Sequence, residues 1–348
     1  MHRRLTSILT PVVVGTLFTL TLIACGTASA ATFPKTNIRF AHTGVPGIPF
    51  HEGVERFAQL LKERTGGAVT VQIFPASQLG SEKDFVEQVK TGVIEMALTG
   101  PMNIAVYDGW GPVGVLAMPY IIQGNTEEEL GRKLVKLTRS PLFVTEIGEK
   151  AATASNIRCV DMGWWFGERH LTTSKKQVTK PEDVKGLKIR TMDTPVAKSA
   201  MAALGAATVP MAVAELYTAL QMGVVDGQEN PFNIIYNRKF HEVQKYLALT
   251  GHMAMNLVII IHEKFYQKLP PELQQVLVKA AMDAGDYQSD LTLKVNKKNL
   301  QDLKDKGMVV TEVNRAEFAK ATKDAWKEFE SLFGKGMYEK IVQEAAKY

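Results

Sequence analysis

Two polar side chains bracket a stretch of sequence that carries few charges in its centre. Arg190 lies near the start of the segment from Lys188 to Pro231, and Asn230 ends the polar sequence Asp-Gly-Gln-Glu-Asn near its close. A guanidinium presents a planar set of donors that suits a carboxylate, and a carboxamide both donates and accepts hydrogen bonds. The two could therefore bind an acid together. The alternative for Arg190 is an ordinary solvated surface arginine.

A short strand is expected to position Arg190. In the sequence GLKIRT, Leu187 and Ile189 alternate with Lys188 and Arg190, so the two sets point to opposite faces. Arg190 comes at the carboxyl end of this strand, where open α/β sheets form their ligand crevices. Helices are expected at 195–204 and 212–222, and extended structure resumes at 224–227.

The first part of the chain has the pattern of parallel βαβ units. Strands are expected at 37–44, 68–75 and 93–100, with helices between them. Ser81 is expected to cap the second helix with Asp84 three residues later, and Gly92 to end it. Similar alternation of strands and helices in the second half predicts a two-domain α/β protein, which the length of 348 residues accommodates.

The last part of the chain is predicted to be mostly helical. A buried strand is expected at 253–262, and an uninterrupted helical pattern of more than thirty residues follows Pro270. At 1.5 Å per residue such a helix is too long for one small lobe, so it is expected to lie across both. A strand at 308–313 and a helix at 315–333 complete the prediction.

No motif for enzymatic or cofactor chemistry has the required context. The glycine pattern at 109–114 contains Pro112 and is not followed by a helix, so a dinucleotide site is not expected. His51-Glu52 lacks the second histidine of a zinc peptidase helix. We therefore expect no cofactor, no metal and no enzyme activity, although a catalytic site assembled from distant residues would leave no local motif.

Composition excludes other classes. The formal net charge is +5, and no run of basic residues longer than two and no basic stripe with aromatics occurs, so no nucleic-acid partner is expected. The chain has 2 cysteines, Cys25 and Cys159, so no disulfide framework is expected.

The first thirty residues are typical of an export signal. Arg3 and Arg4 precede an uncharged run and then small residues, which predicts a signal peptide over 1–30 and a periplasmic protein. Two processing sites fit. Cleavage after Ala30 is favoured, and cleavage before Cys25 would leave a lipoprotein.

Several blocks resemble a known family of binding proteins. The sequences FPASQLGSE, GERHLTTSKKQV, PEDVKGLKIR, ALGAATVPMAVAELYTALQMGVVDGQENP and KFHEVQKYLALTGH occur in that order. Together they resemble the dicarboxylate-binding (DctP-type) solute-binding proteins of TRAP transporters. The resemblance implies a two-lobed periplasmic binding protein fold of α/β class with a long helix spanning both lobes. It also implies lobe I at 31–165 plus about 256–295 and lobe II at 166–255 plus about 296–348.

The resemblance also implies a set of ligand-binding residues. Arg190 matches the family's carboxylate ligand, and Arg169 matches a frequent second ligand, with His170 as the alternative if a gap is placed differently. Asn230 matches the polar ligand of the second lobe. Glu82 and Thr43 match positions in the first lobe that can contact ligand. Trp165 is expected near the pocket, and which of Trp164 and Trp165 faces it stays open.

The implied function is extracytoplasmic binding of an organic acid and its delivery to the small and large membrane subunits of a TRAP permease. The ligand is expected to be a C4-dicarboxylate or a 2-oxo or 2-hydroxy monocarboxylate, aromatic acids included. Val213 stands where some relatives place an aromatic residue over the ligand, which argues against sialic acid. The protein is expected to be monomeric. A sensor subunit that presents the ligand to a receptor and a periplasmic enzyme acting on carboxylated substrates are the alternatives.

Overall fold

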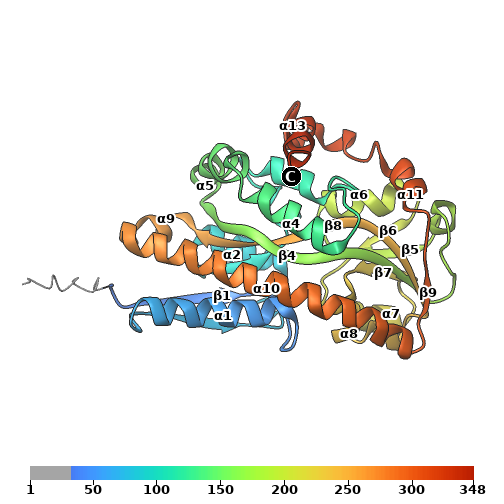
Figure 1. The fold of residues 1–348 in the computed structure, drawn as a ribbon, viewed down its shortest axis with the longest axis horizontal. Helices are drawn as coiled ribbons and strands as arrows, with labels where there is room; N and C mark the ends of the chain where they lie inside the picture. The colour runs from blue at the N-terminus through green and yellow to red at the C-terminus, as the bar shows by residue number, and fades with distance from the viewer. Residues whose placement is uncertain (1–32) are drawn as a thin grey trace, which may run out of the picture. The chain divides into compact units, whose positions relative to one another are not determined.

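The computed structural model describes residues 33–348, which form one nine-stranded mixed sheet with helices on both sides (Figure 1). The strand order is β2-β1-β3-β8-β4-β7-β5-β6, and β9 pairs with β8. The expected signal peptide and Cys25 lie outside the described residues. Within residues 33–348, no helix is both long enough and apolar enough to cross a bilayer.

The first lobe follows the expected βαβ pattern. β1 (Thr36–Ala41) pairs in parallel with β2 (Val69–Phe74) and β3 (Met96–Thr99), and α1 (Pro49–Arg64) and α2 (Glu82–Thr91) connect them. Ser81 caps α2 as predicted, because its hydroxyl accepts from the Asp84 N–H and Asp84 Oδ2 accepts from the Ser81 N–H at 2.7 Å. Gly92 ends α2 with a φ of 77°, a left-handed conformation that favours glycine.

Two long antiparallel strands run through the centre of the sheet. β4 (Ile157–Thr173) and β8 (Tyr246–His262) are each 17 residues long. The end of β8 pairs with β3 of the first lobe, while the end of β4 pairs with β7 of the second. The strand predicted at 253–262 thus begins at Tyr246. Both strands belong to both lobes.

The second lobe contains a smaller parallel sheet. β5 (Lys188–Thr191) lies between β6 (Ala207–Pro210) and β7 (Gly227–Asn230). α6 (Pro195–Ala203) agrees with the prediction, but α7 (Leu216–Gln221) begins four residues later than the predicted start at 212. β6 was not predicted from the sequence. Its β-branched pair Thr208-Val209 is too short for a clear alternating pattern.

The helix predicted at 315–333 is divided in the structure. α11 (Arg315–Thr322) is separated by a turn and a short 3₁₀ segment from α12 (Glu330–Phe333). At the end of α11 the Thr322 hydroxyl donates to the Phe318 carbonyl at 2.9 Å, a local bond that competes with helix continuation. The remaining elements are α3 (Pro101–Ile104), α4 (Glu127–Thr138), a π-helical segment (Leu142–Glu149), α5 (Lys150–Ser155), α8 (Phe232–Asn237), α9 (Glu263–Gln267), β9 (Val309–Thr311) and α13 (Met337–Ala345).

The long helix α10 (Pro271–Asp305) spans 35 residues and lies along β4, with α1 packed on it in one lobe and α8 in the other (Figure 1). The first half of its buried face is apolar, including Leu273, Leu277 and Ala281. The second half is polar, with Gln288, Thr292, Asn296 and Asn299 buried. The predicted long helix across both lobes is confirmed.

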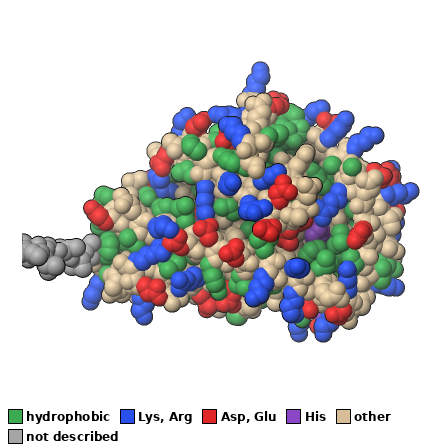
Figure 2. Space-filling view, viewed as in Figure 1, with side chains coloured by type: hydrophobic (Ala, Val, Ile, Leu, Met, Phe, Trp, Pro, Cys, Tyr) green, Lys and Arg blue, Asp and Glu red, His purple; other side chains and the backbone are tan. Residues whose placement is uncertain are grey.

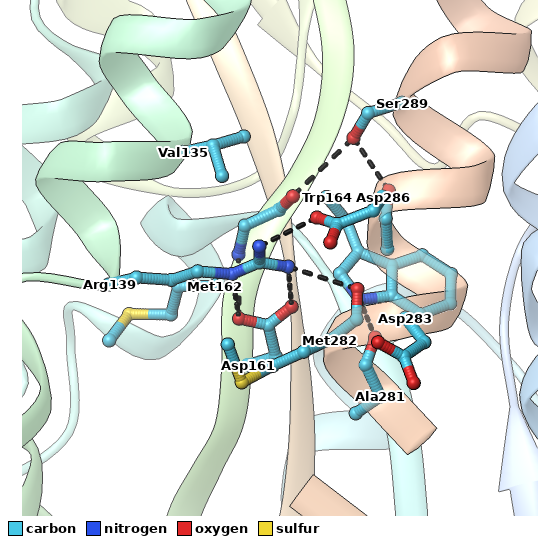
Figure 3. Close-up of polar contacts among 12 residues, drawn as sticks. Val135, Arg139, Asp161, Met162, Trp164, Ala281, Met282, Asp283, Asp286 and Ser289 are labelled. Carbon is cyan, nitrogen blue, oxygen red and sulfur yellow. Dashed lines mark hydrogen bonds and ion pairs between the residues drawn. The ribbon is translucent and has the colours of Figure 1, made fainter. Parts of the chain in front are cut away.

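An arginine fixes α10 to the centre of the sheet. Arg139, which follows α4, donates from Nε and Nη2 to the two carboxylate oxygens of Asp161 on β4, at 3.0 and 2.8 Å. Its Nη1 donates to Asp286 of α10 at 2.6 Å (Figure 3). Trp164 donates from its indole N–H to the Ala281 carbonyl at 3.2 Å. These contacts hold α4, β4 and α10 together.

Candidate functional site

A cavity of about 540 Å³ lies between the two lobes, a size that suits a small organic ligand. Its walls come from the first lobe, the second lobe and the two central strands. The main lining residues are Thr43, Phe50, Glu82, Leu98, Asn103, Phe166, Arg169, Arg190, Met211, Val213, Asn230, Arg238, Met255 and Leu257. Five of the six predicted ligand-binding residues are among them.

Arg190 lies at the end of β5 with 3% of its surface exposed. Its Nε and Nη2 donate to the Met211 carbonyl at 3.0 and 2.8 Å, which orients the guanidinium. Within the described part of the chain, no carboxylate lies within 4.0 Å of it. Burial lowers the pKa of Arg190 to about 10 even though the Glu229 carboxylate favours the charged form. Arg190 is therefore a buried cation that has no paired anion.

Arg169, on β4, has the opposite character. Its Nε is bonded to Glu229 Oε2, and its Nη2 donates to Glu229 Oε1 at 2.9 Å and to the Glu229 carbonyl at 2.6 Å. Burial by itself would raise the pKa of Glu229, but the charge of Arg169 and a 3.2 Å contact from His252 lower it to about 2. Arg169 and Glu229 form a buried ion pair whose charges cancel.

Neutral and acidic groups complete the cavity wall. Asn230 donates from Nδ2 to Gln228 Oε1 at 2.5 Å, and among residues 33–348 nothing donates to its Oδ1. On the first lobe, Asn103 donates to Glu82 Oε2 at 2.7 Å. Burial raises the pKa of Glu82, against the hydrogen bond from Asn103 and the charges of Arg190, Arg169 and Arg238. These oxygens are acceptors suited to ligand hydroxyls.

The two tryptophans do not line the cavity. Adjacent side chains on a strand point to opposite faces, and Phe166 rather than Trp165 reaches the cavity. The Trp165 ring lies against Gly131, where an added Cβ would come within 3.2 Å of it, and Trp164 packs under α10. Contrary to the expectation from sequence, the structure therefore places Trp165 away from the pocket. The aromatic wall is formed by Phe50 and Phe166, whose ring centroids are 5.9 Å apart.

The alternative residue His170 is not among the residues that line the cavity. It stacks on Phe232 with ring centroids 4.3 Å apart and accepts from the Gly251 N–H at 3.0 Å. Of the two neighbouring candidates, Arg169 is the one that the strand directs to the cavity.

Sequence analysis did not identify four residues that line or support the cavity: Phe50, Asn103, Glu229 and Arg238. Glu229 lies in the polar sequence at 226–230, whereas the other three have no local pattern.

One group of side chains has metal-ligating atoms close together. His51, Glu52 and Glu55 place their ligand atoms within 4.8 Å of one another. However, the Gly44 N–H donates to His42 Nδ1, and His42 Nε2 lies 3.3 Å from His51 Nδ1. Burial lowers the pKa of His42 to about 3, so His42 is neutral with its proton on Nε2, directed at His51 Nδ1. His51 Nε2 lies 3.4 Å from Glu55 Oε1, so both ring nitrogens of His51 already face a protein side chain.

The relatives of the chain agree with the fold. Residues 40–332 match the model of the bacterial extracellular solute-binding protein, family 7. The chain is 33% identical to the 2,3-diketo-L-gulonate-binding periplasmic protein YiaO of Escherichia coli (strain K12), over 88% of this chain and 89% of the relative. It is 29% identical to the C4-dicarboxylate-binding periplasmic protein DctP of Rhodobacter capsulatus, over 97% and 96%.

Solved structures are similar over nearly the whole described chain. A TRAP periplasmic solute-binding protein from Actinobacillus succinogenes with bound L-galactonate has a TM-score of 0.83 and 29% identity, over 90% of this chain and 100% of that one. Another, from Ochrobacterium anthropi with bound L-fuconate, has a TM-score of 0.82 and 31% identity, over 89% and 99%. The chain therefore belongs to family 7 of the bacterial extracellular solute-binding proteins, and it is an extracytoplasmic solute-binding subunit of a TRAP transporter.

Proposed function

We propose that this subunit captures a hydroxylated or oxo organic acid and holds its carboxylate on Arg190. The observation that carries the proposal is the buried, unpaired guanidinium of Arg190 on the cavity wall. A buried charge is costly without a partner of opposite sign, so an anionic ligand stabilises the site where a neutral one does not. Bound ligands and names of relatives support the same class, since they include L-galactonate, L-fuconate, 2,3-diketo-L-gulonate and C4-dicarboxylates.

The other cavity residues have separate roles in this proposal. Glu229 holds the Arg169 guanidinium in place through Nε and Nη2, so Arg169 offers Nη1 to the same carboxylate at little loss of side-chain freedom. Asn230 Oδ1 and the Glu82 carboxyl accept from ligand hydroxyls. Phe50 and Phe166 cover the apolar side of the ligand. Thr43 borders the cavity opposite Arg190, and Trp165 supports the fold rather than the ligand.

The wider assignments from sequence are proposals of the same kind. We infer that the subunit acts as a monomer, that its lobes comprise 31–165 plus about 256–295 and 166–255 plus about 296–348, and that export ends with cleavage after Ala30. Acidic and basic side chains are mixed over the face in Figure 2, and the large exposed apolar residues, such as Val93, Val144 and Tyr287, are scattered in sequence. The mixed charge of this face supports a monomer, because stable dimers bury continuous apolar areas.

Thermal unfolding with a panel of ligands tests the proposal. Galactonate, fuconate, malate and succinate are compared with galactitol and fucose, which keep hydroxyl groups but lack the carboxylate. A ligand present at a hundred times its dissociation constant stabilises the fold by about 2.7 kcal/mol, which raises the melting temperature by a measurable amount. We expect stabilisation by acids alone. Stabilisation only by neutral sugars, polyols or amines would overturn the proposal.

A further inference from the structure

A second hollow of about 440 Å³ adjoins the ligand cavity on the second-lobe side. The two share three lining residues, Val213, Ala214 and Arg238. The outer hollow is otherwise lined by Val45, Tyr217, Asn237, Lys239, Phe240 and Glu242. Arg238 therefore lies at the boundary between the cavity and its outer extension, whereas Arg190 lines the inner cavity alone.

Arg238 follows α8 and is half-buried. Its Nη2 donates to the Thr43 carbonyl at 2.6 Å, a contact that joins the two lobes. In the part of the chain that the structure describes, no carboxylate lies within salt-bridge distance of this guanidinium, and its other N–H groups have no protein acceptor. Burial lowers the pKa of Arg238, although the Glu82 charge opposes the effect. Arg238 is thus less buried than Arg190, but it too is a cation without a paired anion.

The arginines of the cavity differ in whether a carboxylate is paired with them. Arg169 is paired with Glu229, whereas among residues 33–348 no carboxylate lies within 4.0 Å of Arg190 or Arg238. The other charged residues of the lining are Glu82, Lys83, Asp84, Asp193 and Glu215. Of these, Glu82 is bonded to Asn103 and Asp84 to Ser81, and Asp193 lies 3.9 Å from Lys83. Beside Arg238, exposed Lys239 adds an ammonium to the outer hollow, where Glu242 is already bonded to the Tyr217 hydroxyl at 2.8 Å. One carboxylate on Arg190 therefore leaves Arg238 still unpaired.

We propose that Arg238 determines ligand specificity by binding a second acidic group, at the end of the ligand opposite the carboxylate held by Arg190. The inference rests on the proposed function and narrows it to hydroxylated diacids, a class that aldaric acids exemplify. Val213 and Arg238 line both hollows, and the N–H groups of Arg238 that are not bonded to Thr43 are the donors for the second acidic group. The guanidinium suits a carboxylate because it can donate two parallel hydrogen bonds.

Matched pairs of acids test this role. Calorimetric titrations compare galactonate with galactarate, gluconate with glucarate and butyrate with succinate, where each pair differs mainly in the second carboxylate. The protein is used as wild type, Arg238→Gln and Lys239→Gln. Glutamine keeps a donor for the Thr43 carbonyl and removes the charge, and Lys239→Gln makes the same charge change at the exposed neighbour. Thermal unfolding of each variant without ligand checks the fold.

We expect wild type to bind at least one diacid tenfold or more tightly than its monoacid partner. Arg238→Gln should weaken diacid binding at least tenfold more than monoacid binding and so remove that preference, and Lys239→Gln should retain it. Equal or tighter binding of every monoacid by wild type would overturn the inference, as would a preference that survives in Arg238→Gln. Monoacid binding without diacid preference leaves the acid-binding function standing. If no acid in any pair or in the wider panel binds, that function is overturned and the inference with it.

Discussion

Arg169 and Arg190 line the same cavity from two different strands, yet only Arg169 is bonded to a carboxylate of the protein. Glu229 balances Arg169 in the absence of ligand. Arg190 is held by the Met211 carbonyl, which orients a guanidinium without neutralising it. The two arginines therefore have different roles. Arg169 stabilises the fold through its ion pair with Glu229, whereas Arg190 stabilises the bound ligand, which supplies its anion.

Replacing Arg190 should weaken ligand binding without loss of fold stability. Arg190→Gln is expected to reduce acid affinity at least a hundredfold, or about 2.7 kcal/mol, because the ligand carboxylate loses its buried partner. The ligand-free melting temperature should stay the same or rise, since a buried unpaired charge is removed. Arg190→Lys should restore binding only in part, because an ammonium lacks the planar pair of donors. Wild-type affinity in Arg190→Gln, measured by calorimetry, would contradict the site assignment.

Replacing Arg169 should mainly lower the stability of the fold. Arg169→Leu leaves Glu229 buried and unpaired, so the free energy of unfolding is expected to fall by about 3–5 kcal/mol. The double variant Arg169→Leu/Glu229→Gln should recover much of this loss, because no isolated charge remains. Urea unfolding of the ligand-free proteins measures both. A single variant as stable as wild type would show that the pair contributes nothing to the fold.

Ligand binding should be accompanied by proton uptake at Glu82. Burial raises the pKa of Glu82 in the ligand-free protein, against the charges of three arginines. An arriving carboxylate adds a negative charge and compensates those arginines, so it raises this pKa further. Affinity should therefore decrease as pH rises. Titrations in two buffers with different ionisation enthalpies measure the uptake, and Glu82→Gln should abolish it. Equal uptake in wild type and Glu82→Gln would assign the proton to another group.

Glu127 should make the fold less stable as pH rises towards 7. Burial raises its pKa to about 7, the charge of Glu168 adds to the effect, and the hydrogen bond from Asn296 opposes it. In the unfolded chain Glu127 ionises near its usual pKa of about 4.3. Between these values the folded state binds more protons than the unfolded state, so stability falls as pH rises, by up to about 4 kcal/mol at 1.36 kcal/mol per pKa unit.

Glu127→Gln tests this effect because a glutamine side chain can still accept from Asn296 Nδ2, the bond that measures 2.6 Å in the structure. We expect the variant to be more stable than wild type at pH 8 and similar to it near pH 4.5. Glu128→Gln is the control, since Glu128 is the exposed neighbour on the same helix. If both variants show the wild-type dependence of unfolding free energy on pH, Glu127 does not titrate in this range.

Much of the fold could be predicted from the sequence where local signals are strong. The capping pair of Ser81 and Asp84, the glycine that ends α2 and the long pattern of α10 all predict the observed elements. The full length of β4 was not accessible. Its side chains are buried on both faces, including Asp161, Glu168 and Arg169, so the alternation of polar and apolar residues that identifies a strand is absent. Ion pairs with residues from distant segments compensate the cost of burying these charges.

The site could be predicted only in part, because some of its residues depend on contacts between distant segments. Arg190 and Asn230 follow from their strands and from the family pattern. Arg238, by contrast, reaches the cavity from the end of α8, and its contact with Thr43 spans 195 positions of sequence. The choice between Trp165 and Phe166 depends on the register of β4, which is irregular between Trp165 and Gly167. A one-residue shift in a strand exchanges the side chains on its two faces, and the sequence does not specify that shift.

The passage of β4, β8 and α10 through both lobes has a consequence for how such proteins diversify. Neither lobe is encoded by one continuous stretch, because each sheet half is completed by strands that enter from the other. A single recombination event between two genes of the family therefore cannot exchange an intact lobe. Such an event produces lobes whose paired strands come from two different parent proteins, with the junction at the ligand cavity. A substitution at a single wall position such as 213 or 238, by contrast, alters the cavity and leaves these shared strands unchanged.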